Sequence, residues 1–464
     1  MNGIRRLFSE PIQRPENPIK LVLLLNARHW LVFLAAFLGW TLDAMDYHAF
    51  NLAVGNMAKD FAVANSVITN GITLALLLRP VGALIFGLLG DRYGRRGPLM
   101  VDIFLFSFLE AMTGFSGNLA VLFFLRCLFG ICLGGEWGLG AALALEELPV
   151  EARGLFAGLL QQGYATGNLL ASGLSAIILP KYGWRALFWI CSFPAVLILF
   201  IRFFVPESPA IQAQIEKREN KKVSFLSDIT ASIKKHWILF VYCVVLMTGF
   251  NFFSHGSQDL YPTFIGSLGY SDAQKSVTNA ISATGAICGG TIIGFFGQYL
   301  GRRRAMILSI LGAAAMIYPW AYSTNLSTLQ VSGFFMQFFV QGAWGVIPAH
   351  LNELSPPSLR ATFPGLTYNL GNMISAASAT IESSLGERYP TVKNGVTIPN
   401  YAITQALLMG IVTCCLVVIV AVGDEKKGRD LTVAEEPEDA TASNSIDAIT
   451  ASTFTEAKVE GPQA

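Results

Sequence analysis

Long apolar stretches run through most of the chain and fall into two groups with a charged segment between them. Each stretch is about 20 residues or longer, the length that a helix needs to cross a hydrocarbon core of ~30 Å. In chain order the stretches are 29–54, 66–89, 98–116, 119–145, 153–179, 184–205, 237–265, 275–299, 304–322, 328–351, 361–384 and 402–422. This pattern predicts an all-α membrane protein with twelve transmembrane helices.

The polar segments around the two groups define the expected domains. Residues 1–28 form a basic N-terminal tail, residues 206–236 form a charged linker, and the Glu-, Asp-, Ser- and Thr-rich residues 423–464 predict a disordered tail. Placing both tails in the cytoplasm puts most of the Arg and Lys residues of the loops on that side. We therefore expect six-helix bundles at 29–205 and 237–422, with both termini cytoplasmic.

The two halves repeat short patterns with a constant offset. The run Gly90–Arg96 recurs as Gly297–Arg303, and Trp137 recurs as Trp344 at the same offset. Parallel repeats of this kind are typical of transporters that bind substrate between two halves, near the membrane midplane. The sequence thus predicts two pseudo-symmetric bundles around a central site.

The composition separates this chain from soluble proteins. Hydrophobic residues make up 53% of the chain and charged residues 14%, whereas soluble domains carry about 25% charged residues. The net charge of +1 gives no indication of a nucleic-acid partner. The seven Cys residues lie in apolar segments without ligand spacing, so we expect packing residues and no metal site. No nucleophile–base set stands out, so we expect no enzyme activity.

A stripe of polar residues interrupts the seventh apolar stretch. Plotted as a helix, Asn251, Ser254, His255 and Gln258 share one face, with Asp259 at its margin. Inside a bilayer each polar group needs a partner, and an ionisable group is especially costly. The stripe therefore predicts a helix face that lines a water-filled cavity or a site. The alternative for the uncharged members is that they only join helices.

Other charged residues lie within the apolar stretches of the first half. Arg79 is in the middle of the second stretch, and its guanidinium suits two-point binding of a carboxylate. The alternative is a structural ion pair with Asp43 or Asp46 in the first stretch. Arg126 and Glu136 are nearly three turns apart in the fourth stretch, so each needs a partner on another helix.

The basic turn after the second stretch predicts a gate. Asp91, Arg92, Arg95 and Arg96 can pair across helix ends in one conformation and separate in another. Gln298 occupies the position in the second half that Asp91 occupies in the first. We therefore expect the second copy of the gate to be weaker.

Three patterns resemble known transporter signatures. The run G-x-x-x-D-R-x-G-R-R from Gly87 to Arg96 looks like the cytoplasmic signature of the major facilitator superfamily. The segments Leu42–Asp46 and Gly134–Gly138 resemble its sialate:proton symporter branch. The stretch N-x-x-S-H-x-S-Q-D-x-x-x-T, which begins at Asn251, resembles the signature of the fungal Jen-type carboxylate permeases at every fixed position. The superfamily resemblance covers about residues 29–422.

The resemblance implies a symporter that imports protons together with short-chain carboxylates, such as lactate, pyruvate, succinate or malate, across a fungal plasma membrane. It favours the carboxylate role of Arg79, because the Jen-type family carries Arg at the matching place. The expected substrate-binding residues are Arg79, Asn251, Ser254, His255, Gln258, Thr166 and Asn369. The expected proton-coupling residues are His255, Asp259 and Asp46.

Two of these positions bear on the size of the substrate. Lactate-type members of the family typically have Phe where this chain has Thr166, and tend to have Gln where it has Asn369. Both changes shorten a side chain and make the expected cavity larger and more polar. They predict a longer or dicarboxylic substrate.

We expect a functional monomer in the lipid bilayer that binds a small carboxylate and protons, with no nucleic acid and no cofactor besides the coupling proton. Two alternatives stay open. One is a carboxylate sensor that has the same fold but does not transport, and the other is a facilitator or antiporter of another organic anion. Arg79 and the His255–Asp259 pair argue against a neutral sugar.

Overall fold

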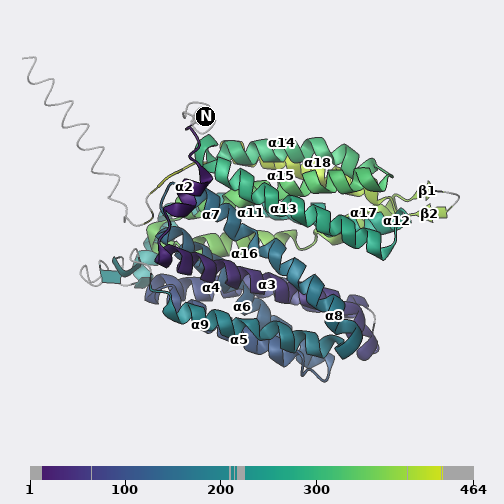
Figure 1. Cartoon of the computed structure of the whole chain (residues 1–464), viewed down its shortest axis with the longest axis horizontal. Helices are drawn as coiled ribbons and strands as arrows, with labels where there is room; N and C mark the ends of the chain where they lie inside the picture. The colour runs from purple at the N-terminus through teal and green to yellow at the C-terminus, as the bar shows by residue number, and fades with distance from the viewer. Residues whose placement is uncertain are drawn as a thin grey trace, which may run out of the picture.

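Two helical bundles lie side by side, with most helices running along the long axis of the molecule (Figure 1). The computed structural model describes residues 13–63, 65–207, 211–213, 215–216, 225–393, 396–429 and 431. Most of the expected C-terminal tail, and residues 1–12, therefore lie outside the described residues.

The first bundle follows a short helix, α2 (Pro18–Leu23), which belongs to the expected N-terminal tail. Its helices are α3 (Ala27–Asp60), α4 (Asn65–Tyr93), α5 (Arg96–Thr113), α6 (Leu119–Glu147), α7 (Arg153–Gln161), α8 (Gly163–Ser192) and α9 (Pro194–Phe204). Asn side chains cap the start of α3 and of α6, where they accept hydrogen bonds from backbone N–H groups of the first turn.

The second bundle begins inside the expected linker. Its elements are α11 (Phe225–Gln258), α12 (Tyr261–Ser267), α13 (Asp272–Leu300), α14 (Arg302–Tyr322), α15 (Leu326–Leu354), the 3-10 helix η1 (Pro357–Leu359), α16 (Thr362–Ser375), α17 (Ser378–Arg388), β1 (Thr391–Lys393), β2 (Val396–Ile398) and α18 (Tyr401–Val422). The helical backbone of α11 is interrupted at His236, directly before the predicted seventh span. The two short strands form an antiparallel hairpin between α17 and α18.

Each of the twelve predicted spans coincides with one helix or with consecutive helices of the described chain. The prediction of an all-α membrane fold is confirmed, with the β1–β2 hairpin as a small addition in a loop. By length and composition alone, seven helical runs of the described residues are apolar enough to cross a membrane, and one of them, Arg153–Phe204, covers two predicted spans. The helices α3, α5 and α15 and the consecutive helices α16 and α17 are not among the seven. In α3 and α5, carboxyl residues such as Asp43 and Asp102 lower the mean hydropathy.

The repeated motif forms the same turn in both halves. Gly94, between α4 and α5, and Gly301, between α13 and α14, both adopt a positive φ that L side chains rarely tolerate. A glutamate that follows the last helix of each half accepts hydrogen bonds from backbone N–H groups just after the glycine turn. Glu207, after α9, accepts them at the start of α5, and Glu425, after α18, accepts them at the start of α14. The equivalent geometry supports the internal duplication that the sequence predicted.

Glycines allow the closest helix contacts. A Cβ atom at Gly134 of α6 would collide with the carbonyl oxygen of Arg79 on α4, so the two backbones touch there. A Cβ atom at Gly158 of α7 would collide with the carbonyl oxygen of Gly290 on α13. The first contact stabilises one half, and the second lets the two halves approach each other.

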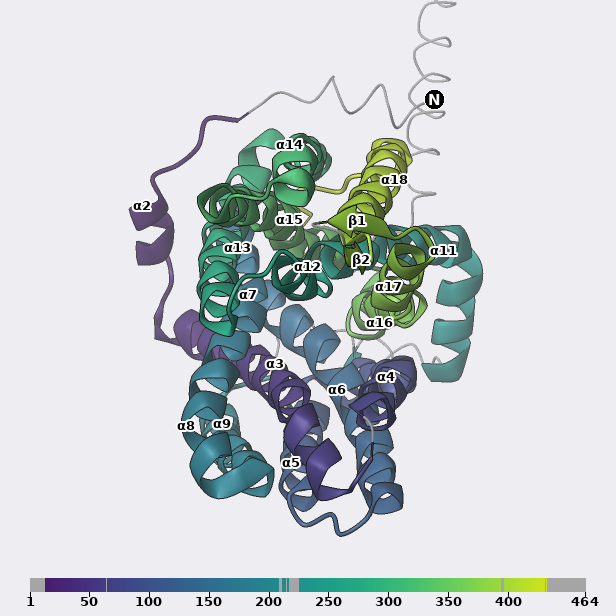
Figure 2. The same ribbon diagram turned by 90° about the vertical axis from the view of Figure 1, so that its right-hand side faces the viewer.

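The two ends of the molecule differ. At the closed end, where α4 passes into α5 and α13 into α14, the halves meet through α4 with α16 and through α7 with α13. The opposite end, which we call the hairpin end, carries α12 and the β1–β2 hairpin. Viewed from the hairpin end, α3 to α6, α8 and α9 occupy the lower part of the molecule and α13 to α18 the upper part (Figure 2).

Candidate functional site

A cavity of about 550 Å³ lies between the two halves. It reaches from the middle of the helices towards the hairpin end, because its lining includes Thr69 and Asn279 near the first turns of α4 and α13. Its other polar lining residues include Tyr47, His48, Asn51, Tyr164, Asn168, His255, Gln258, Asp259, Gln337 and Gln341. The volume is within the usual range of small-molecule sites.

A second, smaller cavity of about 40 Å³ adjoins the first and shares Tyr47, Leu76, Tyr164, His255 and Gln341 with it. Its further lining residues are Trp40, Arg79, Gln161, Asn251, Ser254, Trp344, Tyr368 and Asn372. Both halves contribute to each cavity, so the site lies on the pseudo-symmetry interface that the sequence predicted.

The end of α11 brings the predicted polar stripe into these cavities. The helix ends at Gln258, and α12 begins at Tyr261, so Asp259 lies in the break between them. Nδ1 of His255 lies 3.0 Å from a carboxylate oxygen of Asp259, and Nε2 lies 3.0 Å from the amide oxygen of Asn372. The ring faces two acceptors, and it can donate to both only when it carries both protons.

The uncharged members of the stripe are tied to neighbouring helices. Gln258 donates to the amide oxygen of Gln337 on α15 (2.9 Å) and to the hydroxyl of Ser254 (3.2 Å). Gln341 also donates to Ser254, and Asn251 donates to the backbone carbonyl of Met247. These bonds fix the amide groups of α11 and α15 as one wall of the cavity.

Arg79 enters the smaller cavity from α4. Its side chain is buried, and the centre of its guanidinium lies 6.0 Å from the ring centre of Tyr368 on α16. Within the described residues it forms no ion pair with a carboxylate, so neither Asp43 nor Asp46 is its salt-bridge partner. A buried guanidinium that bonds to no carboxylate directly is costly unless an anion reaches it.

Thr166 and Asn369 lie outside the walls of both cavities. The hydroxyl of Thr166 donates to the carbonyl of Gln162, and Thr166 lies between the cavity residues Ala165 and Asn168 of α8. The amide of Asn369 is buried and donates to the carbonyl of Gly134 in the first half (3.1 Å). Asn369 thus joins the two halves in this conformation.

Asp46 is also away from the cavities, in a buried polar group of the first half. Arg126, on α6, donates to Glu110 on α5 at 2.6 Å and to Thr113 at 2.7 Å. Asp46 lies within electrostatic reach of Glu110 and Arg126. The prediction that Arg126 and Glu136 need partners on other helices is confirmed, because Glu136 pairs with Arg202 of α9 at 2.9 Å.

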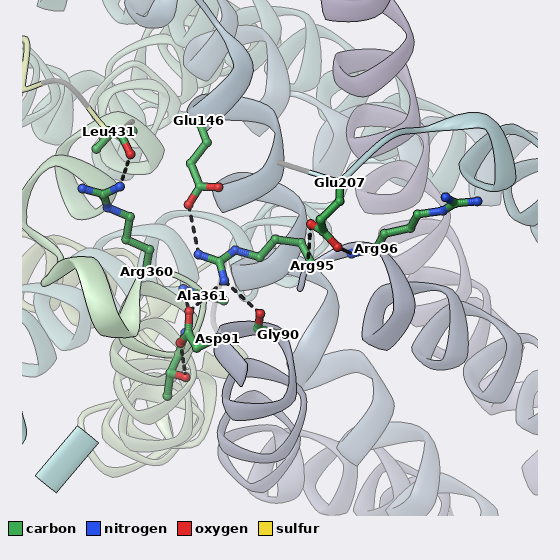
Figure 3. A network of polar contacts seen from close by, with 10 residues as sticks. Gly90, Asp91, Arg95, Arg96, Glu146, Glu207, Arg360, Ala361 and Leu431 are labelled. Carbon is green, nitrogen blue, oxygen red and sulfur yellow. Dashed lines mark hydrogen bonds and ion pairs between the residues drawn. The ribbon is translucent and has the colours of Figure 1, made fainter. Parts of the chain in front are cut away.

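The residues of the predicted gate lie at the closed end, and Figure 3 shows the polar contacts around them. Asp91 accepts hydrogen bonds from the backbone N–H groups of Ala361 and Thr362, each at 3.0 Å, and from the hydroxyl of Thr362 at 2.6 Å. Arg95 bridges Asp91 (2.9 Å) and Glu146 (3.0 Å) within the first half. The side chains of Asp91, Arg95, Glu146 and Thr362 are all buried.

The other two predicted gate residues are peripheral in this conformation. Arg92 is exposed, with its guanidinium 4.8 Å from the ring centre of Tyr93. Arg96 donates to the backbone carbonyl of Phe203 at the end of α9. Asp91 is therefore a gate residue whose side chain bonds directly to the second half.

The second half has an equivalent of the contacts that Arg95 makes within the first half. Arg302 forms a two-point ion pair with Glu353 (3.1 and 3.0 Å) and donates to Gln298 at 2.6 Å. Glu353 also lies 4.0 Å from Arg153 of the first half. Asp91 contacts the N-terminus of α16 with a carboxylate. Its counterpart in the second half, Gln298, has a neutral amide.

One ionisable residue near the site was not predicted from the sequence. Glu382 of α17 is fully buried, and its two carboxylate oxygens have no hydrogen-bond partner among the described residues. It lies within electrostatic reach of His255 and Asp259. A Glu inside the predicted span 361–384 was the available signal, because ionisable residues within membrane helices mark sites.

Comparisons with known proteins agree with the fold and the repeats. The sequence profile described as Major Facilitator Superfamily matches residues 30–288 and 260–455. Among solved structures, the proton:xylose symporter XylE has a TM-score of 0.67 at 17% identity, covering 88% of this chain and 98% of its own. The human organic anion transporter MFSD10 has a TM-score of 0.67 at 15% identity, covering 84% and 99%. At these identities the structures establish the fold alone.

Two curated relatives extend the assignment. A protein of Saccharomyces cerevisiae named carboxylic acid transporter protein homolog is 33% identical over 445 residues, which are 90% of this chain and 71% of that protein. The sialic acid transporter NanX of Escherichia coli is 27% identical over 375 residues, 80% of this chain and 90% of NanX. The chain belongs to the major facilitator superfamily, a class of membrane transporters and not of enzymes. Within it, the chain belongs to the fungal Jen-type family that its signature predicted.

Proposed function

We propose that the protein is a symporter that imports short-chain carboxylates together with protons by alternating access. The observation that carries this proposal is Arg79, a buried guanidinium in the smaller cavity with no carboxylate partner in the described chain. Guanidinium groups bind carboxylates through two parallel hydrogen bonds. A substrate carboxylate would supply the directly bonded anion that Arg79 lacks. The name of the yeast relative, carboxylic acid transporter protein homolog, agrees with such a substrate.

The rest of the cavity favours a substrate with further polar groups. Asn251, Ser254, His255 and Gln258 present hydrogen-bonding groups on the second half. Their amide and hydroxyl groups suit the hydroxyl of lactate, the keto group of pyruvate or the second carboxylate of succinate or malate. We propose that Thr166 and Asn369 affect this choice through the packing of α8 and α16, since neither forms the cavity wall.

The proposed proton-coupling groups are His255 and Asp259 at the cavity and Asp46 in the first half. The side chain of Asp259 is 40% exposed and that of His255 is 19% exposed, so protons from the aqueous phase can reach this pair. A proton held beside the bound anion lowers the electrostatic cost of burying each of them.

The proposed orientation places the closed end and both termini in the cytoplasm, because the Lys- and Arg-rich turns lie at that end. The cavity reaches towards the hairpin end, so this conformation corresponds to the outward-facing state of a plasma-membrane importer. Opening the other end requires the bonds from Asp91 to Ala361 and Thr362 to break. We propose that the monomer completes this cycle, since both halves of the site come from one chain.

Substrate binding to the purified protein tests the role of Arg79. We expect Arg79→Ala to weaken lactate or succinate binding roughly 10- to 100-fold, because hydrogen bonds to charged groups contribute about 1.5–3 kcal/mol. Arg185→Ala is the control, because Arg185 pairs with Asp60 in a contact that is partly exposed to solvent. Equal affinity of wild type and Arg79→Ala in calorimetric titrations would contradict the assignment. Binding without transport would favour the sensor.

A further inference from the structure

A dry cluster of charged residues lies in the first half, beside the substrate cavity. Its members are Asp43 of α3, Asp102 of α5, Glu136 of α6 and Arg202 of α9, each at most 2% exposed. Glu136 and Arg202 pair at 2.9 Å. This pair lies directly against α3, because a Cβ atom at Gly39, one turn before Asp43, would collide with Glu136. Arg202 thus bonds to Glu136 directly and lies within electrostatic reach of Asp43 and Asp102.

The charges of this cluster do not balance by themselves. Both carboxylate oxygens of Asp43 and of Asp102 lack hydrogen-bond partners in the part of the chain that the structure describes. Three ionised carboxylates around one guanidinium would leave a buried net negative charge, which the low-dielectric interior strongly disfavours. The cluster must gain positive charge, and the small, mobile cation that a sealed site can take up is the proton.

A second guanidinium connects this cluster to the substrate site. Arg79 lies within electrostatic reach of Asp43. The backbone contact at Gly134 sets α6 against α4 beside Arg79, only two residues before Glu136. Asp43 also lies one helical turn from Tyr47, which lines both cavities.

Ionisable groups on several surrounding helices lie within electrostatic reach of Asp43. Among the described residues these groups include Arg79 of α4, Asp102 of α5, Cys132 and Glu136 of α6, Arg202 of α9, Tyr368 of α16 and, on its own helix, Asp46. Glu136 already engages Arg202 directly. Arg79 is thus the cation of this set that faces both Asp43 and the substrate cavity.

We propose that Asp43 is the proton-binding group that responds when a substrate carboxylate binds Arg79. The proposal rests on the proposed function and adds the group that links anion binding to proton binding. With the site empty, the charge of Arg79 compensates the carboxylate of Asp43. A bound substrate carboxylate takes over that compensation, so one proton from water forms an O–H bond with Asp43. The loaded site has then gained one anion and one proton, with no change of net charge.

Release reverses both steps. When the anion leaves Arg79 on the other side of the membrane, the O–H bond of Asp43 breaks and the proton passes to water. Since Asp43 is 1% exposed whereas the side chain of Asp259 is 40% exposed, the two carboxyl groups have different roles. Asp259 exchanges protons at the cavity surface, and Asp43 stores the proton beside the bound anion.

Proton uptake on lactate binding tests this proposal. Calorimetric titration of the purified protein with lactate, in buffers of different ionisation enthalpy, measures the protons taken up per anion bound. We expect wild type to take up close to one proton. Asp43→Asn should bind lactate with no proton uptake, because the amide imitates the protonated carboxyl, and should keep lactate exchange while losing gradient-driven accumulation. Asp60→Asn, in the pair with Arg185 at the far end of α3, is the matched control.

The outcomes separate the two proposals. Full proton uptake by Asp43→Asn overturns the role of Asp43. If only Asp259→Asn loses proton uptake, Asp259 at the cavity is the proton-binding group and the symport proposal stands. Lactate binding by wild type without proton uptake overturns both. If Asp43→Asn does not fold, infrared difference spectra recorded with and without lactate, for wild type and for Asp43→Glu, serve as the test. Lactate should then add a protonated-carboxyl band whose position differs between the two, and an identical or absent band contradicts the proposal.

Discussion

Asp91 and Thr362 join the two halves at the closed end. The carboxylate of Asp91 accepts the backbone N–H of Thr362 at 3.0 Å and its hydroxyl at 2.6 Å. Thr362 begins α16, so the negative charge also faces the positive end of a helix dipole. Gly87 permits this contact, because a Cβ atom there would lie 2.7 Å from the Cα atom of Thr362. One carboxylate thus supplies several of the bonds that an inward-opening motion must break.

Asp91→Asn should favour opening of the closed end. An Asn side chain keeps one acceptor oxygen but loses the charge, and charge-assisted bonds contribute about 1.5–3 kcal/mol each. We expect the ratio of closed to open molecules to fall at least roughly tenfold. Distances between spin labels at the ends of α4 and α16 would measure this ratio. Asp60→Asn should leave the distance distribution unchanged, and an unchanged distribution in Asp91→Asn would contradict the gate.

Gly134→Ala should destabilise the first half. The new methyl group would collide with the carbonyl of Arg79 and push α6 away from α4. Overpacking of this kind costs about 1–3 kcal/mol. Gly410→Ala in α18 is the matched control, because its Cβ atom meets nothing within 4 Å and Ala favours a helix. Thermal unfolding of the two variants should differ clearly, and similar midpoints would mean that the backbones are not in contact.

Glu353→Gln should be among the most destabilising changes at the closed end. It leaves the buried guanidinium of Arg302 without its two-point carboxylate partner. Breaking a buried pair in this way costs about 3–5 kcal/mol. A double-mutant cycle with Arg302→Met measures the coupling, and the double variant should recover much of the lost stability. Additive losses would show that the pair is not coupled.

Thr166→Phe should shift the substrate preference towards lactate. The larger ring, between the cavity residues Ala165 and Asn168 of α8, would occupy space that a longer dicarboxylate needs. A pocket changes selectivity by about 1–3 kcal/mol per small group, so the succinate-to-lactate uptake ratio should fall roughly tenfold. Asn369→Gln tests the second position in the same assay. An unchanged ratio in both variants would remove these positions from the account of substrate size.

Much of the fold could be predicted because the membrane leaves few alternatives. Apolar length determined where helices occur, and the repeated Gly94 and Gly301 turns revealed the duplication. Breaks within spans were harder to predict. The division of α16 from α17 and the end of α11 at Gln258 depend on local packing around the site, which hydropathy does not report.

The candidate site was predictable in part, for a related reason. The stripe from Asn251 to Asp259 lies on one helix, so its periodicity alone placed it together. Residues from other helices, such as Gln337 and Tyr368, required knowledge of which faces meet. Asn369 shows the same limit, because its helix lines the site while its own side chain bonds to Gly134 of the other half.

The central claim is that anion movement is driven by protons, and transport in proteoliposomes tests it most directly. Labelled lactate and labelled succinate would be supplied outside, with and without an inward proton gradient. We expect at least one label to accumulate above its external concentration only with the gradient, and a protonophore to abolish the accumulation. Equilibration of either label at the same rate and to the same level with or without the gradient would contradict the symport account.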